Sequence, residues 1–337
     1  MLPIFLSYEN IHVSAFFFFL TSNSDVYSTI SNEELDALVQ EIHCVHPNVG
    51  NKMMMGHLNS RGIRIQRHRV RESMRRVDME GTLTRRMAIR TSHRCQYSVA
   101  APNSLWHIDG NHKLIRFVVH GGIDGFSRLI VYLLAATNNR ASTVFNSFLS
   151  AIMQYGTPSR VRSDKGGKNI QVAHYMVHQQ GENRNSHITG KSVHNQRIER
   201  LWRDVYENVL DLFYTVFTRL EYEGLLDPDN EIHPFSLHRC YLHHIQHHLK
   251  MFQDAWNHHG LRTAGSRSPF QLWLLNEREG PHNHHAEGLS IPEVELSRPL
   301  TEQDIASLPN PTVPFSEAIA TYCETVDILT GMLEQSA

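Results

Sequence analysis

The spacing of apolar residues changes along the chain and separates a helical front part from a mixed middle part. Between residues 31 and 76, apolar residues recur every three or four positions, which is the spacing of one face of an α-helix. The first set runs from Leu35 to Ile42, and Ser31 with Glu34 ahead of it has the form of a capping box. The pattern predicts three helices, from Ser31 to about Pro47 and over residues 51–58 and 66–76, with a turn at Gly62 before the third.

Short apolar runs replace this helical spacing in the middle of the chain. Runs at residues 106–114, 117–123 and 128–135 predict three strands, and Asp124-Gly125 between the second and third is a strong hairpin signal. A helix is expected over 141–155, a short strand over 159–163 and a further helix over 172–178. Strands mixed with helices in this order predict an α/β domain built on a mixed sheet.

Helical spacing returns after residue 193 and predicts a long helix over 193–222, a second over 235–259 and a short one within 262–273. The second contains His243, His244, His247 and His248, for which we expect a structural or exposed role. From about residue 277 the chain is polar, acidic and contains proline, which predicts a flexible or loosely packed tail.

Five segments follow from these patterns. They are an unassigned leader at 1–28, a helix-turn-helix-like basic module at 29–77, a linker at 78–103, an α/β core at 104–276 and an acidic tail at 277–337. The leader holds an apolar run at residues 13–20, which is shorter than the roughly 20 residues of a membrane span and follows no positive n-region. We therefore interpret it as a non-homologous leader rather than a targeting element.

Composition is that of a soluble globular protein, with 41% hydrophobic and 20% charged residues among 337. The four cysteines, at positions 44, 95, 240 and 323, are far apart and form no CxxC pair, so a zinc knuckle or ribbon is not expected. Scattered cysteines suit a reducing compartment. The composition favours an intracellular, soluble protein without a membrane partner.

The net charge of −2 conceals a strong asymmetry. Residues 52–94 hold 12 Lys and Arg against 3 Asp and Glu, whereas residues 277–337 hold 2 against 11. A basic front suits nucleic acid, because the planar guanidinium of arginine binds phosphate bidentately. The alternative is a small packing domain with a solvated basic face. The candidate nucleic-acid-binding arginines are Arg64, Arg67, Arg69, Arg71, Arg75 and Arg76.

Three acidic residues are the candidate chemistry of the core. Asp109 and Asp164 end apolar runs that predict strands, and Glu199 lies on the predicted helix 35 positions after Asp164. Isolated acids of this kind are most often surface carboxylates. If the three converge, they supply the hard oxygen ligands that Mg²⁺ prefers, and two-metal sites cut and join phosphodiester bonds.

The segments around these acids resemble the integrase core of retroviral integrases and retrovirus-like transposases. Residues 105–116 (LWHIDGNHKLIR) and 195–204 (NQRIERLWRD) are similar to runs in metazoan integrase core domain-containing proteins, and the resemblance extends from about residue 30 to about 276. It implies a ribonuclease-H-like mixed sheet flanked by helices and preceded by a small all-α helix-turn-helix module. Residues 61–76 also resemble the helix-turn-helix found ahead of some transposase cores.

The resemblance also implies an activity. Asp109, Asp164 and Glu199 would be the catalytic and metal-binding residues of a DDE-type polynucleotidyl transferase, with two Mg²⁺ or Mn²⁺ ions and Asp109 bridging both. It further implies DNA as the partner, a homo-oligomer, no small-molecule cofactor and a nuclear location.

The stretch after Asp164 departs from the family pattern. Histidine and glutamate are expected where Lys165 and Lys168 stand. Two cations there could lower the local affinity for metal, or they could bind a DNA phosphate. The enzyme hypothesis therefore has an alternative, a domesticated non-catalytic DNA-binding protein derived from a mobile element. A third hypothesis is that the sequence is a degenerate open reading frame whose product has no maintained role.

Overall fold

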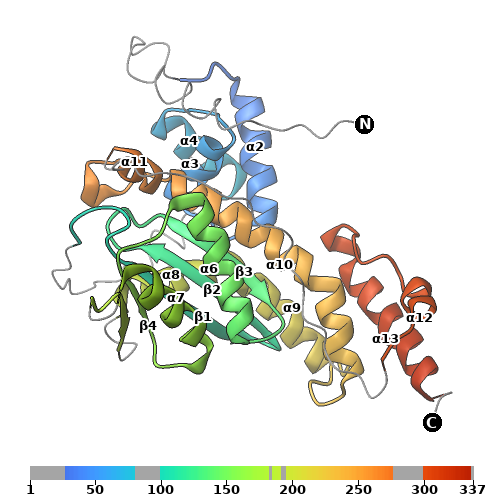
Figure 1. Ribbon diagram of the computed structural model, residues 1–337. Coiled ribbons are helices and arrows are strands. Elements are labelled where there is room, and N and C mark those ends of the chain that lie inside the picture. The colour runs from blue at the N-terminus through green and yellow to red at the C-terminus, as the bar shows by residue number, and fades with distance from the viewer. Residues whose placement is uncertain (1–26, 80–98, 182–183, 191–194, 276–298, 335–337) are drawn as a thin grey trace, which may run out of the picture.

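The protein is built around one five-stranded mixed sheet (Figure 1). The computed structural model describes residues 27–79, 99–181, 184–190, 195–275 and 299–334. The strand order is β3-β2-β1-β4-β5. β1 (Trp106–Leu114), β2 (Phe117–Asp124) and β3 (Ile130–Ala136) are antiparallel neighbours. β4 (Val161–Ser163) and β5 (His187–Thr189) continue the sheet in parallel with β1. This is the mixed sheet that the sequence predicts, with one additional short strand, β5.

Helices cover both faces of the sheet and enclose two apolar cores. On one face, α6 (Ala141–Tyr155) and α7 (Ile170–Gln180) pack with Trp106 and Ile108. On the other, α8 (Gln196–Val205), the π-helical turn η4 (Tyr206–Leu210), α9 (Asp211–Tyr222) and α10 (Ile232–His258) pack with Val119. The predicted helix at 193–222 is thus continuous from residue 196 but contains a π-helical turn. Within the described ranges, no helix combines the length and the apolarity that crossing a membrane requires.

α10 connects the core to the elements at both ends of the chain (Figure 1). Its 27 residues span about 40 Å, at 1.5 Å per residue. Its C-terminal part packs against α3 (Asn51–Ser60) so closely that a Cβ at Gly56 would collide with the carbonyl oxygen of Ala255. Its N-terminal part packs against α13 (Ala318–Glu334), where Cys240 contacts Thr325. A short helix, α11 (Pro269–Leu274), follows and begins with a capping box.

The front module consists of α2 (Asn32–Val45), α3 (Asn51–Ser60) and α4 (Arg67–Val77). The capping box of Ser31 and Glu34 is present, as the sequence predicts. The three helices enclose their own apolar core, which includes Leu35, Leu58 and Val70. These helices are confirmed; their use as a helix-turn-helix on DNA stays a prediction.

The prediction of a flexible tail is wrong for residues 299–334. α12 (Glu302–Ser307), the turn η6 (Phe315–Glu317) and α13 (Ala318–Glu334) form there. Ala318, Tyr322 and Leu329 are fully buried, at the spacing of one helix face. The apolar face was not predicted because acidic residues dominate the composition of the segment. The leader at 1–26, most of the linker (80–98) and residues 276–298 lie outside the described residues.

A group of buried histidines lies where the front module meets α10. His46 stacks on His57 with ring centroids 4.8 Å apart and meets His248 edge-on at 5.3 Å. Burial lowers the pKa of His46 to about 4 and the pKa of His57 and His248 to about 3. The three rings are therefore neutral at pH 7, and the contact between module and core depends on their staying neutral.

This group predicts a loss of stability in mild acid. The folded pKa values lie below the unfolded value of about 6.5, so the unfolded chain binds more protons between pH 6.5 and 4, and stability present above pH 6.5 falls as pH falls. Each buried histidine contributes about 1.4 kcal/mol per pH unit in that window. Urea unfolding between pH 7 and 5 should show a shallower pH slope in His57→Phe, by about that amount. His68→Phe, on the exposed face of α4, should keep the wild-type slope. An unchanged slope in His57→Phe would contradict the assignment.

Candidate active site

The sheet register brings Asp109 and Asp164 to the same level of adjacent strands. β1 and β4 are parallel, with Trp106 opposite Val161 and His107 opposite Arg162. Asp109 lies two residues after His107, within β1, and Asp164 lies two residues after Arg162, just beyond the end of β4. The predicted convergence of these two carboxylates therefore follows from strand pairing.

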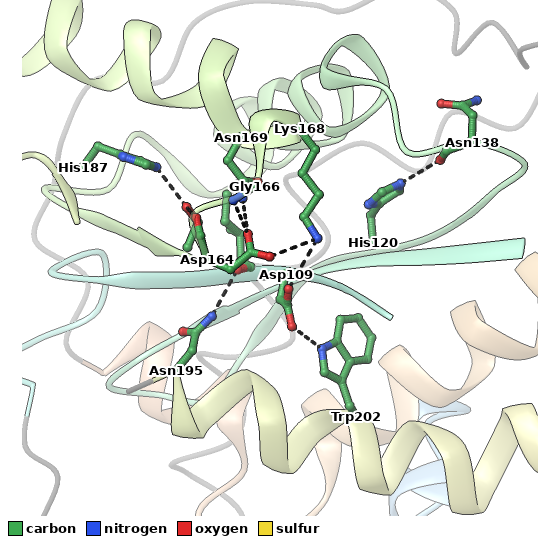
Figure 2. A network of polar contacts seen from close by, with 12 residues as sticks. Asp109, His120, Asn138, Asp164, Gly166, Lys168, Asn169, His187, Asn195 and Trp202 are labelled. Carbon is green, nitrogen blue, oxygen red and sulfur yellow. Dashed lines mark hydrogen bonds and ion pairs between the residues drawn. The ribbon is translucent and has the colours of Figure 1, made fainter. Parts of the chain in front are cut away.

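Lys168 lies between the two carboxylates (Figure 2). Its Nζ is 3.6 Å from Oδ1 of Asp109 and 3.5 Å from Oδ2 of Asp164, and its side chain is only 7% exposed. The two oxygens are thus no more than about 7 Å apart. At that distance two carboxylates repel by roughly 2 kcal/mol at an effective dielectric constant of about 20. The ammonium group offsets this repulsion.

The remaining oxygen of each carboxylate accepts a hydrogen bond from a neutral donor (Figure 2). Asn169 Nδ2 donates to Oδ1 of Asp164 at 2.6 Å, and the backbone N–H of Gly166 approaches the same oxygen at 3.4 Å. Trp202 Nε1 donates to Oδ2 of Asp109 at 3.0 Å. Each acid is thereby held in one orientation, with its other oxygen toward Lys168.

Two glycines lie next to the lysine, and the one on β1 approaches it more closely than a side chain would allow without a shift. A Cβ at Gly110 would lie 3.1 Å from Nζ of Lys168 and 3.3 Å from Nδ1 of His120. A Cβ at Gly166 would lie 3.5 Å from Cε of Lys168. His120 is buried and hydrogen-bonds through Nε2 to the carbonyl oxygen of Asn138 at 3.1 Å. Its burial, with a smaller effect of the Lys168 charge, lowers its pKa to about 4, so this wall of the site is neutral.

α8 carries Glu199 and is fixed to β1 at two points. Near its start, Asn195 hydrogen-bonds to the His107 ring and donates from Nδ2 to the carbonyl oxygen of Ile108 at 3.2 Å. One turn after Glu199, Trp202 reaches Asp109. Residues three apart on a helix share a face, so Glu199 lies on the side of α8 that faces Asp109. Glu199 is exposed, but the limited desolvation of its carboxyl, and then the Asp109 charge, raise its pKa, while Lys113 lowers it.

The donor atoms are those that Mg²⁺ prefers, but a divalent ion could lie between the two aspartates only after Lys168 had moved. Asp109 and Asp164 converge on the Lys168 ammonium group, and Glu199 is exposed beside Asp109. No three His, Cys, Asp or Glu side chains among the described residues are grouped to hold a metal. The position between the two aspartates is taken by a lysine.

Five of the six candidate arginines of the front module divide into two groups, and Arg64 stands apart from both. Arg76 forms a bidentate pair with Asp36, and Arg69 donates to the carbonyl oxygen of Ile30. These two support the module internally. Arg64 is half-buried, and burial lowers its pKa.

The second group consists of Arg67, Arg71 and Arg75, which are exposed. They recur every four residues and so share one face of α4. Lys165 is likewise exposed beside the acidic site, whereas Lys168 is enclosed in it.

Several residues of the site were not singled out from the sequence. Asn169 and Trp202 orient the two aspartates, and Asn195 fixes the start of α8. The role of Trp202 could have been predicted, because it lies three residues from Glu199 on the same helix face. Helical spacing alone identifies it only as an apolar residue of that helix. The contacts of Asn169 and Asn195 depend on loops whose course had no sequence signal.

The family model "Integrase core domain" matches residues 96–283, more than half of the chain. Among curated proteins, no sequence matches the chain significantly. Solved structures that resemble it include the HTLV-2 integrase catalytic core domain in complex with magnesium, in a trimeric form (16% identity, 51% of this chain and 97% of that one, TM-score 0.35).

Two further structures are similar at the same level. One is the simian T-cell lymphotropic virus intasome in complex with the PP2A regulatory subunit B56 gamma (16%, 78% of each chain, 0.41). The other is the BIV integrase catalytic core domain (17%, 51% and 95%, 0.35). Likenesses of this strength transfer neither residues nor activities.

The Trp202–Asp109 contact predicts a measurable difference between two tryptophans. Trp202→Phe removes a hydrogen bond to a carboxylate and should lower the free energy of unfolding by about 1.5–3 kcal/mol. Trp256→Phe is the matched control, because Trp256 Nε1 donates at 2.9 Å to the neutral carbonyl of Arg128 and its loss should cost about 0.5–1.5 kcal/mol. Urea unfolding of both variants measures the difference. Equal losses would contradict a charge-assisted bond at Asp109.

Proposed function

Because the chain belongs to the integrase core domain family, we propose that it binds DNA and acts as an integrase- or transposase-type polynucleotidyl transferase. The observation that supports this best is the convergence of Asp109 and Asp164 on one cation, with Glu199 on the helix that contacts Asp109. Three acids from a central strand, the adjacent strand end and a helix that crosses them give the site its negative charge.

In this proposal Asp109, Asp164 and Glu199 are the catalytic and metal-binding residues of DNA strand transfer. Two Mg²⁺ or Mn²⁺ ions, when bound, supply activation of the attacking hydroxyl and neutralisation of charge on the phosphate. The protein's own residues orient the acids: Trp202 fixes Asp109, Asn169 fixes Asp164, and Asn195 sets the position of α8. Lys168 has to leave the space between the aspartates before an ion can enter it.

The DNA surface in this proposal combines two regions. The exposed face of α4 with Arg67, Arg71 and Arg75 would contact backbone phosphates, which supply most of non-specific affinity. Lys165, exposed beside the acidic site, would contact a phosphate near the reacting strand. A nuclear location and a homo-oligomer acting on paired DNA ends belong to the same proposal.

A second candidate is a DNA-binding protein that performs no strand transfer. It is favoured by one observation, the burial of Lys168 between two of the three acids. In that case the core would be a scaffold, and the ion pairs of Lys168 would keep it folded without metal.

Metal-dependent nicking of supercoiled plasmid distinguishes the two candidates. We expect the wild-type chain to nick plasmid with Mn²⁺ and more slowly with Mg²⁺, and Asp164→Asn to fall to the background of a protein-free reaction. Asp229→Asn, which changes an exposed carboxylate outside the site, should retain wild-type nicking. Silence of the wild type with both ions, or equal nicking by Asp164→Asn, would count against the transferase.

DNA binding is tested separately through its salt dependence. Replacing Arg67, Arg71 and Arg75 with Gln should weaken binding to duplex DNA and make the slope of log K against log salt shallower by roughly one unit for each arginine that contacts phosphate. A control triple, Arg219, Arg262 and Arg267 to Gln, removes the same charge from exposed sites outside the module. If both triples change the slope equally, α4 is not the DNA surface.

A further inference from the structure

We propose that Lys168 is a built-in cation of the acidic site: its ammonium group holds Asp109 and Asp164 together without metal and competes with a divalent ion for the space between them. This inference rests on the proposed function in that it concerns the same three acids, and it assigns a regulatory residue to them. A divalent ion would have to displace Lys168, which makes metal entry a competition rather than the filling of an open site.

The contacts of Lys168 are those of a cation held on two sides. Nζ lies within 3.6 Å of an oxygen from each aspartate, and 93% of the side chain is covered. An ammonium group is removed from water to this extent only when anions compensate it. Asp109 in β1 and Asp164 just after β4 are the two anions. The second oxygen of each carboxylate accepts a hydrogen bond from a neutral donor.

The backbone of β1 passes close to the end of the Lys168 side chain. Gly110, on β1, would contact Nζ if it carried a Cβ, and Gly166, on the loop before η2 (Gly167–Asn169), would contact Cε. The neutral His120 closes the side beyond Gly110. Lys168 is also four residues after Asp164, so the turn of η2 brings its side chain back over the strand end.

A phosphate-binding role for Lys168 fits these contacts less well. A DNA phosphate that reached Nζ would have to lie beside two carboxylates that already face it, where like charges repel. Lys165 offers an internal comparison, because it has the same side chain three residues earlier and is exposed. Phosphate contact suits Lys165, and charge compensation inside the site suits Lys168.

The test measures metal binding and needs neither DNA nor activity. Mn²⁺ affinity of the full chain is measured by titration with detection of the free ion by electron paramagnetic resonance, for wild type, Lys168→Met and Lys165→Met. We expect Lys168→Met to bind Mn²⁺ roughly 10- to 1000-fold more tightly than wild type, the range that one nearby charge exerts on ionisation. Lys165→Met, which removes the same charge from an exposed position, should differ from wild type by much less.

Thermal unfolding gives the second readout. In EDTA, Lys168→Met should unfold at a lower temperature than wild type, and Mn²⁺ should raise its unfolding temperature again. The unfolding temperatures of wild type and Lys165→Met should change little with EDTA or with Mn²⁺. If Lys168→Met does not fold in EDTA, Lys168→Gln, which keeps a neutral polar group in the same space, is used with the same expectation. Adding Asp109→Asn to either variant should abolish the gain in Mn²⁺ affinity.

The proposal is overturned if Lys168→Met and Lys168→Gln bind Mn²⁺ no more tightly than Lys165→Met, or if Mn²⁺ restores neither variant. These outcomes are separate from failure of the proposed function. A chain that never nicks DNA but gains Mn²⁺ affinity on loss of Lys168 supports the built-in cation and not the transferase. A chain that nicks DNA but gains no Mn²⁺ affinity on loss of Lys168 supports the transferase and not the built-in cation.

Discussion

Two carboxylates at the same level of neighbouring strands repel each other, and the core places a positive charge between them. The parallel pairing of β1 and β4 carries Asp109 and Asp164 to one end of the sheet. Their mutual repulsion would oppose that pairing if nothing compensated it. Lys168 supplies the compensation from the turn that directly follows β4. The end of β4, the turn after it and the lysine thus meet at one place, where the ammonium group balances the two carboxylates.

The rest of the fold keeps that unit in place. α8 is tied to β1 by Asn195 and Trp202, so Glu199 cannot move far from Asp109 without breaking one of these contacts. α10 lies behind this arrangement and packs against β3, the front module and α13. Because the module meets α10 through Gly56 and a group of neutral histidines, the basic face of α4 has a fixed position relative to the core.

The sequence predicts most of this fold because the informative patterns are local. Apolar spacing located the front helices, the first four strands and α10 to within a few residues. The motif around Asp109 and the helical position of Glu199 gave the candidate triad. β5 was missed because its three residues contain one apolar side chain, Ile188, and no motif follows it as the Asp164 motif follows the equally short β4. The apolar face of α13 was missed because acidic residues dominate the composition of its segment.

What the sequence could not give are the contacts between distant segments. Arg69 and Arg76 read as DNA-binding residues like their neighbours on α4, yet Arg76 pairs with Asp36 forty positions away. Lys168 was recognised as a departure from the family pattern, and its spacing from Asp164 was visible. The sequence could not show whether Lys168 lies next to the acidic site or between its two aspartates. That depends on the position of Asp109, which the pairing of β1 with β4 determines.

The most direct test of this account is a crystal structure of the wild-type chain and of Lys168→Met, both grown with Mn²⁺, with anomalous difference maps at the manganese edge. At an Mn²⁺ concentration that just saturates the variant, we predict a much weaker manganese peak between Asp109 and Asp164 in the wild type than in the variant, with Nζ of Lys168 still in contact with both carboxylates. Manganese peaks of equal height in the two crystals at that concentration would contradict the central claim.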